Sequence, residues 1–423
     1  GERRFKHNRE SKVSLNEYTG KLMKVFGDNA MFGVCFYMAC LFRDHIVKQF
    51  GFFPILNLFG PKGAGKTELA ISLMQFFGNQ SKGPNLTNTT KAALADHVAM
   101  FSNTCCHIDE YKNNIEYEKI EFLKGLWDGT GRTRMNMDKD RKKETTHVDT
   151  GIILSGQEMP TADIVLFSRL IFLSFTKVEY TDYEKSIFNE LKEMEKTGLT
   201  NITHHLLSYR AEFIENFIEN YNASAKVITD MLAGGVIEDR IFRNWLVILA
   251  AYRTLKEKVK LPFAEDELFH TAVSLIVRQN SETKKSNELS IFWSIVEFLA
   301  NNGKIREDVD FKIDYVTRLK TDRIESEWPT PKTVIYINHS QIFQLYLTHG
   351  NQSKQSILPI KTIEYYLCNC KEYLGRKNSV AFKVVDNGQV VEDGMDSEGI
   401  PITKRKITTA MVFDYNPLNI NMA

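Results

Sequence analysis

The sequence of 423 residues lacks an excess of charge of one sign. It holds 54 lysine and arginine residues against 53 aspartate and glutamate residues, which leaves a formal net charge of +1. No global electrostatic field therefore draws the chain to nucleic acid or to a membrane surface, and we expect no membrane partner. Any contact with a polyanion must come from local basic patches.

Cysteines and long apolar runs are also scarce. Six cysteines in no paired framework are typical of a reducing compartment, and we expect a cytoplasmic location. Cys368 and Cys370 have no second cysteine or histidine pair near them at zinc spacing, so they are expected to be ordinary packed thiols. The longest uncharged apolar run, residues 30–42, is shorter than the ~20 residues that span a bilayer and predicts a buried helix.

Internal repeats and low-complexity tracts are absent as well. The chain is 43% hydrophobic and 25% charged, which excludes disorder, a collagen-like fibre and a coiled-coil rod. Its length predicts two or three domains. Residues 1–12 are polar and basic, begin with Gly1 and lack the residue order of a signal peptide. We therefore expect a fragment of a longer protein, in which a further domain could precede this chain.

Changes of pattern along the chain predict four segments. Residues 1–49 have apolar residues at helical spacing, whereas 50–180 alternate short apolar runs with glycine-containing loops, which is typical of an α/β fold with a parallel sheet. Residues 181–285 are predicted to be almost wholly helical and to form a lid. The polar stretch 281–290 predicts a linker to the last segment, 286–423.

The last segment has a pattern of its own. Helices are predicted over 291–300, 340–347 and 360–373, and strands over 334–337, 380–385 and 408–413. The loop between the last two strands is rich in glycine, aspartate and lysine. Helices followed by a two-stranded hairpin with a long loop are typical of a winged helix.

A glycine-rich loop carries the clearest functional signal. It matches G-x-x-x-x-G-K-[ST] in full and reads Gly60, Pro61, Lys62, Gly63, Ala64, Gly65, Lys66 and Thr67. A predicted strand (52–59) precedes it and a predicted helix (69–77) follows, which argues against a chance glycine turn. The backbone N–H groups would face phosphates, Lys66 would reach the β- and γ-phosphates, and the Thr67 hydroxyl would bind Mg²⁺. The loop predicts ATP and Mg²⁺ as ligands.

Two adjacent acids supply the second half of such a site. Asp109 and Glu110 follow a short apolar run, and Asp109 lies 42 residues after Thr67. Asp109 would hold the Mg²⁺ shell, and Glu110 would act as the general base toward water. Adjacent acids after a strand also occur as plain surface turns, but joined to the phosphate loop they predict hydrolysis of ATP. His107, inside the run, is expected to be a core histidine.

Two further candidates lie downstream. Gln157 follows the apolar run 151–155, whose end would lie near the γ-phosphate, so Gln157 either orients the water or is an ordinary loop glutamine. Arg169 directly precedes the apolar run 170–175 and cannot be buried without a partner. It is either an arginine finger that acts on a nucleotide held by the next subunit or the partner in a structural salt bridge.

A basic hairpin is predicted within 129–150. Up to Glu144 this stretch holds three negative residues and six positive ones, namely Arg132, Arg134, Lys139, Arg141, Lys142 and Lys143. Alternation on either side of 138–140 predicts two strands with a positive tip, which would contact a phosphate backbone without reading sequence. A charged hairpin exposed only to solvent is the alternative. The run 404–406, Lys-Arg-Lys, is a second basic cluster with the same ambiguity.

Together these features resemble a AAA+ ATPase of the helicase branch. The phosphate loop, the acid pair, the basic hairpin, Gln157 and Ser168-Arg169 occur in an order similar to that of MCM-like and superfamily 3 replicative helicases. The stretches 85–112 and 127–132 look like replication proteins of phages and mobile elements, which are often fused to a primase. The resemblance covers about 50–285 well and the C-terminal part loosely.

The resemblance implies a P-loop core within a ring oligomer, a hexamer, whose hairpin projects into the central channel and grips DNA. It implies that Arg169 is a finger in trans, although Leu170-Ile171 follow it where MCM proteins usually have Phe-Asp. It also implies a second sensor arginine on the helical lid, for which Arg240 and Arg243 are both candidates.

The expected function is that of an ATP-dependent helicase acting on single-stranded or forked DNA in the replication of a mobile element or phage. One alternative is a AAA+ remodeller without unwinding activity. Another is an initiator or regulator that binds a duplex site through its winged helix and uses ATP only as a switch. The basic hairpin favours the helicase.

Overall fold

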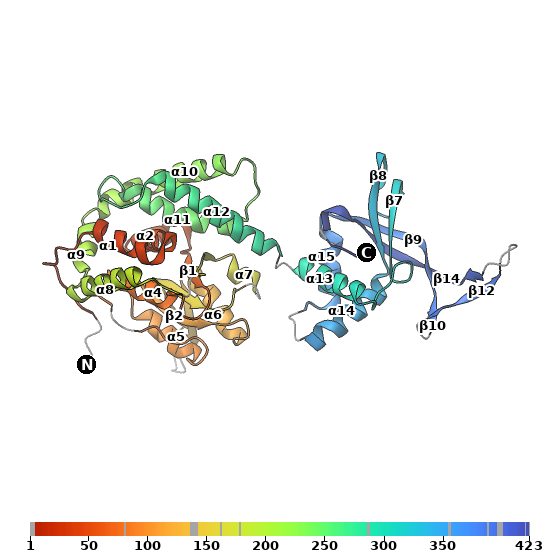
Figure 1. The fold of residues 1–423 in the computed structure, drawn as a ribbon, viewed down its shortest axis with the longest axis horizontal. Coiled ribbons are helices and arrows are strands. Elements are labelled where there is room, and N and C mark those ends of the chain that lie inside the picture. The colour runs from red at the N-terminus through yellow and green to blue at the C-terminus, as the bar shows by residue number, and fades with distance from the viewer. Residues whose placement is uncertain are drawn as a thin grey trace. The chain divides into compact units, whose positions relative to one another are not determined.

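The computed structural model describes residues 5–79, 82–135, 143–160, 163–176, 179–285, 288–353, 357–386, 389–395, 401–418 and 420–422. The chain forms two compact units, Gly1–Thr283 and Lys284–Ala423 (Figure 1). Each unit has hydrophobic core residues of its own.

The first unit alternates strands and helices, and this confirms the predicted α/β fold. Its helices are α1 (Leu15–Phe26), α2 (Asp28–Cys40), α3 (Arg43–Phe50), α4 (Lys66–Gln75), α5 (Lys91–Ala99), α6 (Tyr117–Trp127), α7 (Ile164–Phe167), α8 (Asp182–Thr197), α9 (Thr200–Leu207), α10 (Arg210–Met231), α11 (Asp239–Leu255) and α12 (Glu265–Lys285). Its strands are β1 (Ile55–Phe59), β2 (Ser102–Tyr111), β3 (Thr130–Met135), β4 (Lys143–His147), β5 (Asp149–Gly156) and β6 (Leu170–Ser174).

A four-stranded parallel sheet lies at the centre of this unit. The strand order is β2-β5-β1-β6, and helices surround the sheet (Figure 1). Strands covered on both faces are apolar along their whole length, and β1 and β6 are buried at nearly every residue. All four strands end at the same edge, so the loops after β1, β2 and β5 come together there.

The N-terminal helices belong to the core of the same unit. Every side chain of α2 from Ala30 to Cys40 is buried, which confirms the predicted buried helix. A helix that is apolar on all sides must be surrounded, and α2 contacts α1, α4, α11 and β2. No single described helix is long and apolar enough to cross a membrane, and only α2 and α3 taken together, bent by 80°, meet that test.

Residues 182–285 are largely helical, as predicted. The boundary between the two units, after Thr283, lies within the predicted linker 281–290, but most of that stretch is helical. Helix α12 continues to Lys285 and α13 begins at Glu288. The reason lies in tertiary contacts, because the Gln279 amide donates to the carbonyl of Leu170 at 2.8 Å and the Asn280 amide donates to the carbonyl of Val236 at 3.0 Å. These bonds hold the end of α12 against the unit, so its polar residues remain helical.

The second unit combines three longer helices with an antiparallel sheet. Its helices are α13 (Glu288–Asn301), α14 (His339–Ser353), α15 (Ile360–Asn369) and a short 3₁₀ helix (Asn416–Leu418). Its strands are β7 (Phe311–Lys320), β8 (Glu325–Ile337), β9 (Tyr373–Lys383), β10 (Val385–Asp386), β11 (Gln389–Val390), β12 (Glu392–Met395), β13 (Pro401–Thr403) and β14 (Arg405–Asp414). The main sheet has the order β7-β8-β14-β9.

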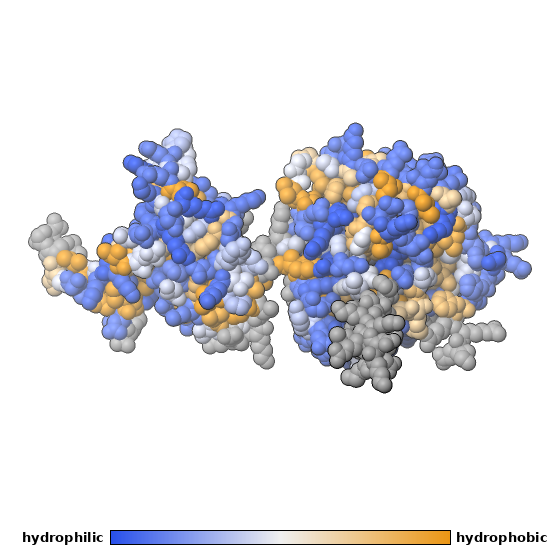
Figure 2. All heavy atoms as spheres, turned by 180° about the vertical axis from the view of Figure 1, so that it is seen from behind, coloured by the Kyte–Doolittle hydropathy of each residue, from blue (hydrophilic) through white to orange (hydrophobic). Residues whose placement is uncertain are grey.

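Two features of this unit differ from the predictions. The predicted helix 360–373 ends at Asn369, because the chain turns extended at Cys370 and Glu372 accepts a backbone hydrogen bond from Asp414 at 2.8 Å. Strand β7 was not predicted, because its alternation of apolar and polar residues covers only 311–315. Strands β7 and β8 form a long hairpin that is hydrophilic over most of its length in Figure 2, at the upper left. The winged-helix interpretation stays a prediction.

Candidate active site

The phosphate loop joins the end of β1 to the start of α4. Gly63 has a φ of 80°, and a Cβ there would meet no heavy atom within 4 Å, so the backbone is open to a ligand. Gly60 has a φ of 152°, and a Cβ would lie 2.3 Å from the carbonyl oxygen of Phe175. The tight loop therefore needs glycine at position 60, whereas Gly63 leaves space for phosphate oxygens.

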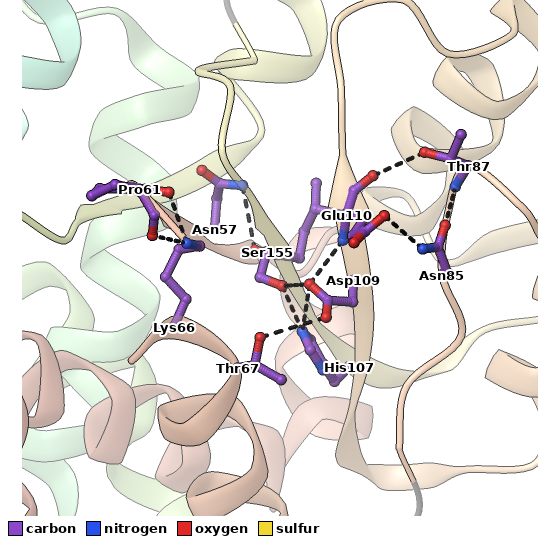
Figure 3. Close-up of polar contacts among 12 residues, drawn as sticks. Asn57, Pro61, Lys66, Thr67, Asn85, Thr87, His107, Asp109, Glu110 and Ser155 are labelled. Atoms are coloured by element: carbon purple, nitrogen blue, oxygen red, sulfur yellow. Dashed lines mark hydrogen bonds and ion pairs between the residues drawn. The ribbon is translucent and has the colours of Figure 1, made fainter. Parts of the chain in front are cut away.

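Lys66 is the first residue of α4 and is 7% exposed. Its Nζ donates to the carbonyl oxygens of Gly60 and Pro61, both at 2.7 Å, as Figure 3 shows. Burial lowers the pKa of the ammonium group, and the charge of Asp109 opposes that shift. The ammonium group is thus held inside the loop, where a phosphate could replace the carbonyls as its acceptor.

Asp109, at the end of β2, lies at the centre of a hydrogen-bonded chain (Figure 3). Its Oδ2 accepts from the Thr67 hydroxyl at 3.5 Å, and its Oδ1 accepts from the Ser155 hydroxyl. Ser155 Oγ also lies 2.7 Å from His107 Nε2. Because Ser155 gives its only hydrogen to Asp109, Nε2 must carry the hydrogen in that contact. The hydrogen bonds therefore connect His107 of β2 to Ser155 of β5, and Ser155 to Asp109 and through it to Thr67, the two candidate Mg²⁺ ligands.

His107 is a buried core histidine, as predicted, and is 2% exposed. Burial lowers its pKa to about 4, while the charge of Asp109 acts in the opposite direction. The imidazole is therefore neutral at neutral pH and acts here as a hydrogen-bond donor. Its role is to hold Ser155 in place.

Glu110 is exposed and has an unusual backbone conformation, with a φ of 60°. The register of β2 against β5 shifts between Ile108 and Tyr111, and this irregularity frees Glu110 from the regular ladder. Asn85 Nδ2 donates to Glu110 Oε2 at 2.7 Å. The side chain of Asn85 is itself fixed, because its Oδ1 accepts from the backbone of Thr87 at 2.9 Å and of Asn88 at 3.0 Å.

Gln157 directly follows β5 and is exposed. The preceding residue, Gly156, accepts a hydrogen bond from the Gly60 N–H at 3.3 Å, so Gln157 begins next to the phosphate loop. The structure thus brings Lys66, Thr67, Asp109, Glu110 and Gln157 to one edge of the sheet. The residue of β5 that contacts Asp109 is Ser155.

Arg169 lies at the opposite edge of the same sheet. It precedes Leu170, which pairs with Ile55 at the start of β1, whereas the phosphate loop follows Phe59 at its end. Four residues of strand separate these levels, about 13 Å. Arg169 therefore lies away from the phosphate loop of its own subunit.

An aromatic ring and a carboxylate hold Arg169 in place. Its guanidinium lies 5.4 Å from the centre of the Trp127 ring, and its Nη2 lies 3.8 Å from Asp128 Oδ2. Burial lowers the pKa of the guanidinium, and Asp128 opposes that shift. Its buried Nε has no hydrogen-bond acceptor.

The two lid arginines lie at this second edge as well. Arg240 sits 5.8 Å from the Trp127 ring, and Arg243 sits 4.6 Å from the ring of Phe52. Arg243 also forms an ion pair with Asp239 at 3.8 Å. The structure does not bring either arginine to the phosphate loop, and instead gathers both near Arg169.

The predicted basic hairpin is present as β3 and β4, which pair antiparallel from Thr130 with His147 to Met135 with Lys143. Arg132, Arg134 and Lys143 belong to these strands. Lys139, Arg141 and Lys142 lie outside the described residues. The hairpin immediately precedes β5, the strand that carries Ser155.

Sequence reasoning missed Asn85 and Ser155 as members of the site. Each is a common polar residue without a motif of its own, and only the pairing of neighbouring segments places it beside an acid. Among the described residues no group of three or more histidine, cysteine, aspartate or glutamate side chains could hold a metal ion. Thr67 and Asp109 offer two oxygens, which suits Mg²⁺ that takes its other ligands from phosphate and water.

Comparisons with known proteins address the fold. No family model and no curated protein matches the sequence. Among solved structures the chain is similar to the SCCmec type IV Cch active helicase, with a TM-score of 0.61 at 14% identity over 96% of this chain and 72% of that one. It is also similar to a full-length MCM homologue from Methanopyrus kandleri, with a TM-score of 0.37 at 10% identity over 66% of this chain and 64% of that one, which is too low to support an inference. The first likeness is one of fold, and a four-stranded parallel sheet flanked by helices fits a P-loop core.

Proposed function

We propose that the chain is an ATP-dependent DNA helicase that works as a ring, a hexamer, in the replication of a mobile element or phage. The observation that carries the proposal is the hydrogen bond from Thr67 to Asp109, which joins the phosphate loop to the acid pair. The likeness to the SCCmec type IV Cch active helicase supports the choice of helicase among AAA+ functions.

Each subunit binds ATP through residues 60–67, and Mg²⁺ held by Thr67 and Asp109 would neutralise charge on the phosphates. Glu110 takes the proton of a water molecule whose oxygen attacks the γ-phosphorus, and ADP leaves. Asn85 orients the carboxylate of Glu110 for this step. Gln157, next to the loop, responds to the γ-phosphate.

The site is completed by the neighbouring subunit. Arg169 and Arg240 lie at the edge of the sheet that faces away from their own phosphate loop, so a ring places them against the loop of the next copy. There they stabilise negative charge that develops on the transferring phosphoryl group. Arg243, which is paired with Asp239, supports the same interface.

DNA is bound by the hairpin of β3 and β4. The hairpin leads directly into β5, and Ser155 of β5 contacts Asp109. Hydrolysis of the bound nucleotide at Asp109 can therefore move the hairpin through a single strand, β5. Its positive residues contact the backbone of a single strand or a fork without reading sequence. A primase, as a domain or as a separate protein, is the proposed partner of the ring.

The decisive experiment measures ATP turnover with and without single-stranded DNA on protein whose oligomeric state is checked by light scattering. The wild-type ring should be stimulated by DNA, and Glu110→Gln should abolish turnover by about 10²-fold or more. A Lys139/Arg141/Lys142 triple alanine variant should lose the stimulation and keep the basal rate.

A matched control removes three positive charges from a different hairpin, that of β7 and β8 in the second unit. The Lys312/Arg318/Lys320 triple alanine variant changes residues of β7, of which Arg318 and Lys320 are exposed and Lys312 is half-buried, and should keep the stimulation. A hairpin variant that is stimulated as strongly as wild type would contradict translocation by this hairpin. An oligomer that hydrolyses ATP but ignores single strands would favour a AAA+ remodeller or a duplex-binding switch.

A further inference from the structure

The second unit contains a cavity of about 530 Å³ that the site in the first unit does not use. Its walls come from the turn after α13, the first turn of α14, and the facing ends of β9 and β14. Four cationic side chains line it, namely Lys304, Arg306, Lys383 and Lys406. The cavity is therefore a basic groove built from segments far apart in the sequence.

The acidic residues at this groove are already engaged. Asp310 is buried, accepts a hydrogen bond from the Arg306 N–H at 2.9 Å, and has its pKa raised by burial. Asp308 forms an ion pair with Lys383 at 2.9 Å. Lys304 and Lys406 are exposed and have no ion pair within the described part of the chain. Two ammonium groups thus face the groove without a counter-charge.

The start of α14 adds two polar groups to the same groove. Asn338 and Gln341 line the wall, and the first N–H groups of α14 lie between them. The N-terminal end of a helix carries a partial positive charge, which strengthens the field of the lysines. Every charge in the groove beyond the engaged carboxylates is therefore positive.

The structure also decides which residue of the basic run 404–406 contributes. Lys406 pairs with Phe382 across β14 and β9, and it lines the groove, whereas Lys404 and Arg405 do not. Phe382 is 2% exposed, so its ring offers no surface on which a base could stack. The groove is built to contact phosphates and not bases.

We propose that this groove binds the phosphodiester backbone of nucleic acid, in a sequence-independent manner, through Lys304 and Lys406. The choice of nucleic acid over free phosphate rests on the proposed function and on the exposed position of both ammonium groups at the rim of the groove. This contact is separate from the hairpin of β3 and β4, because it belongs to the other unit. It anchors the strand independently of ATP.

The test uses the full chain without nucleotide and measures binding of a labelled single-stranded oligonucleotide over a series of salt concentrations. The Lys304→Ala/Lys406→Ala variant removes two phosphate contacts, so the slope of log affinity against log salt should fall by about 1.4. At low salt the affinity should fall by about 10- to 100-fold. A Lys361→Ala/Lys371→Ala variant removes two exposed lysines of the same unit, on and just after α15, and should leave slope and affinity unchanged.

Thermal unfolding confirms that both variants are folded. An unchanged salt slope in the Lys304/Lys406 variant would overturn the proposal, as would an equal loss in the Lys361/Lys371 control. A competition experiment adds inorganic phosphate or ATP at micromolar concentration. If either displaces the oligonucleotide from the wild-type chain but not from the Lys304/Lys406 variant, free phosphate is the ligand of the groove, and the proposal is overturned.

Failure of the groove contact can be distinguished from failure of the proposed helicase. The Lys139/Arg141/Lys142 triple variant should still lose affinity when Lys304 and Lys406 are replaced, even if DNA fails to stimulate ATP turnover. Conversely, if DNA stimulates ATP turnover but the affinity for DNA does not depend on Lys304 and Lys406, the proposed helicase is retained and the proposed groove contact is wrong.

Discussion

The two edges of the central parallel sheet hold their charged side chains in different ways. At the edge after β1 and β2, hydroxyl groups and carbonyl oxygens are hydrogen-bonded to Asp109 and Lys66. At the opposite edge, Arg169 and Arg240 lie over the ring of Trp127, and the nearest carboxylate of Arg169 is 3.8 Å away. One edge is a closed network, and the other is a pair of stacked cations.

The two edges differ in how firmly their charged groups are fixed. A closed hydrogen-bonded network fixes the geometry of groups that act within one subunit. The Arg169 guanidinium lies against an aromatic face, donates from Nη1 to the carbonyl of Val165 at 3.3 Å, and has a buried Nε without an acceptor. On the proposal that the chain forms a ring, the second edge would complete a site on a neighbouring copy.

The largest effect is expected from the second edge. Arg169→Ala should lower ATP turnover by about 10³-fold or more, because a finger in trans stabilises transition-state charge. A ring mixed in equal parts from Arg169→Ala and Glu110→Gln subunits should regain activity, since about a quarter of its interfaces combine an intact Glu110 with an intact arginine. Turnover of the mixture is measured against each variant alone.

Arg240→Ala removes the other cation from Trp127 and leaves Arg169 in place. Because we propose that both arginines act on the same phosphoryl group, this variant should also lower turnover. If mixing restores nothing, Arg169 acts within its own subunit or only through its ion pair with Asp128. In that case the loss of Arg169 should appear as lower thermal stability in the single variant. A fully active Arg169→Ala variant would contradict the role that we propose for the second edge.

A smaller effect is expected at the first edge from Asn85→Ala. This change removes the donor that holds the Glu110 carboxylate, and a hydrogen bond to a charged group contributes about 1.5–3 kcal/mol, so turnover should fall about tenfold or more. The KM for ATP should stay close to that of wild type. Asn88→Ala is the matched control, because only the backbone of Asn88 contacts Asn85. A rise in turnover would show that Asn85 holds Glu110 in an unreactive orientation.

The smallest effect concerns the stability of the first edge. Ser155→Ala leaves the buried N–H of His107 without an acceptor and should lower the free energy of unfolding by about 1–3 kcal/mol, as measured by urea denaturation. A double-mutant cycle with His107→Leu separates the contact from each residue's own contribution. Strictly additive effects would mean that the two side chains do not support each other.

Much of the first unit could be predicted from local sequence. The phosphate loop has glycines at positions that need a positive φ, and Lys66 begins a helix directly after them, so motif and structure coincide. The buried helix α2 follows from an apolar run without charge. The hairpin of β3 and β4 follows from alternation around a polar turn.

Other elements could not be predicted because distant segments stabilise them. Residues 281–285 are polar and read as a linker, yet Gln279 and Asn280 hold α12 against β6 and the loop before α11. Strand β7 alternates apolar and polar residues only over 311–315, and its full length depends on pairing with β8. Arg240 and Arg243 lie on a helix, α11, and the path of this helix takes them to Trp127 and Phe52.

The sequence by itself determined the chemistry that the first unit offers, namely a phosphate loop followed by a strand that ends in two acids. These features depend on neighbouring residues, since backbone conformation and the order of strand, loop and helix are local properties. Only the tertiary structure decided that Ser155 and Asn85 hold the acids, that the arginines gather at the opposite edge, and that Lys304 and Lys406 line one groove. Such pairs depend on strand register and helix packing, which bring together residues that are far apart along the chain.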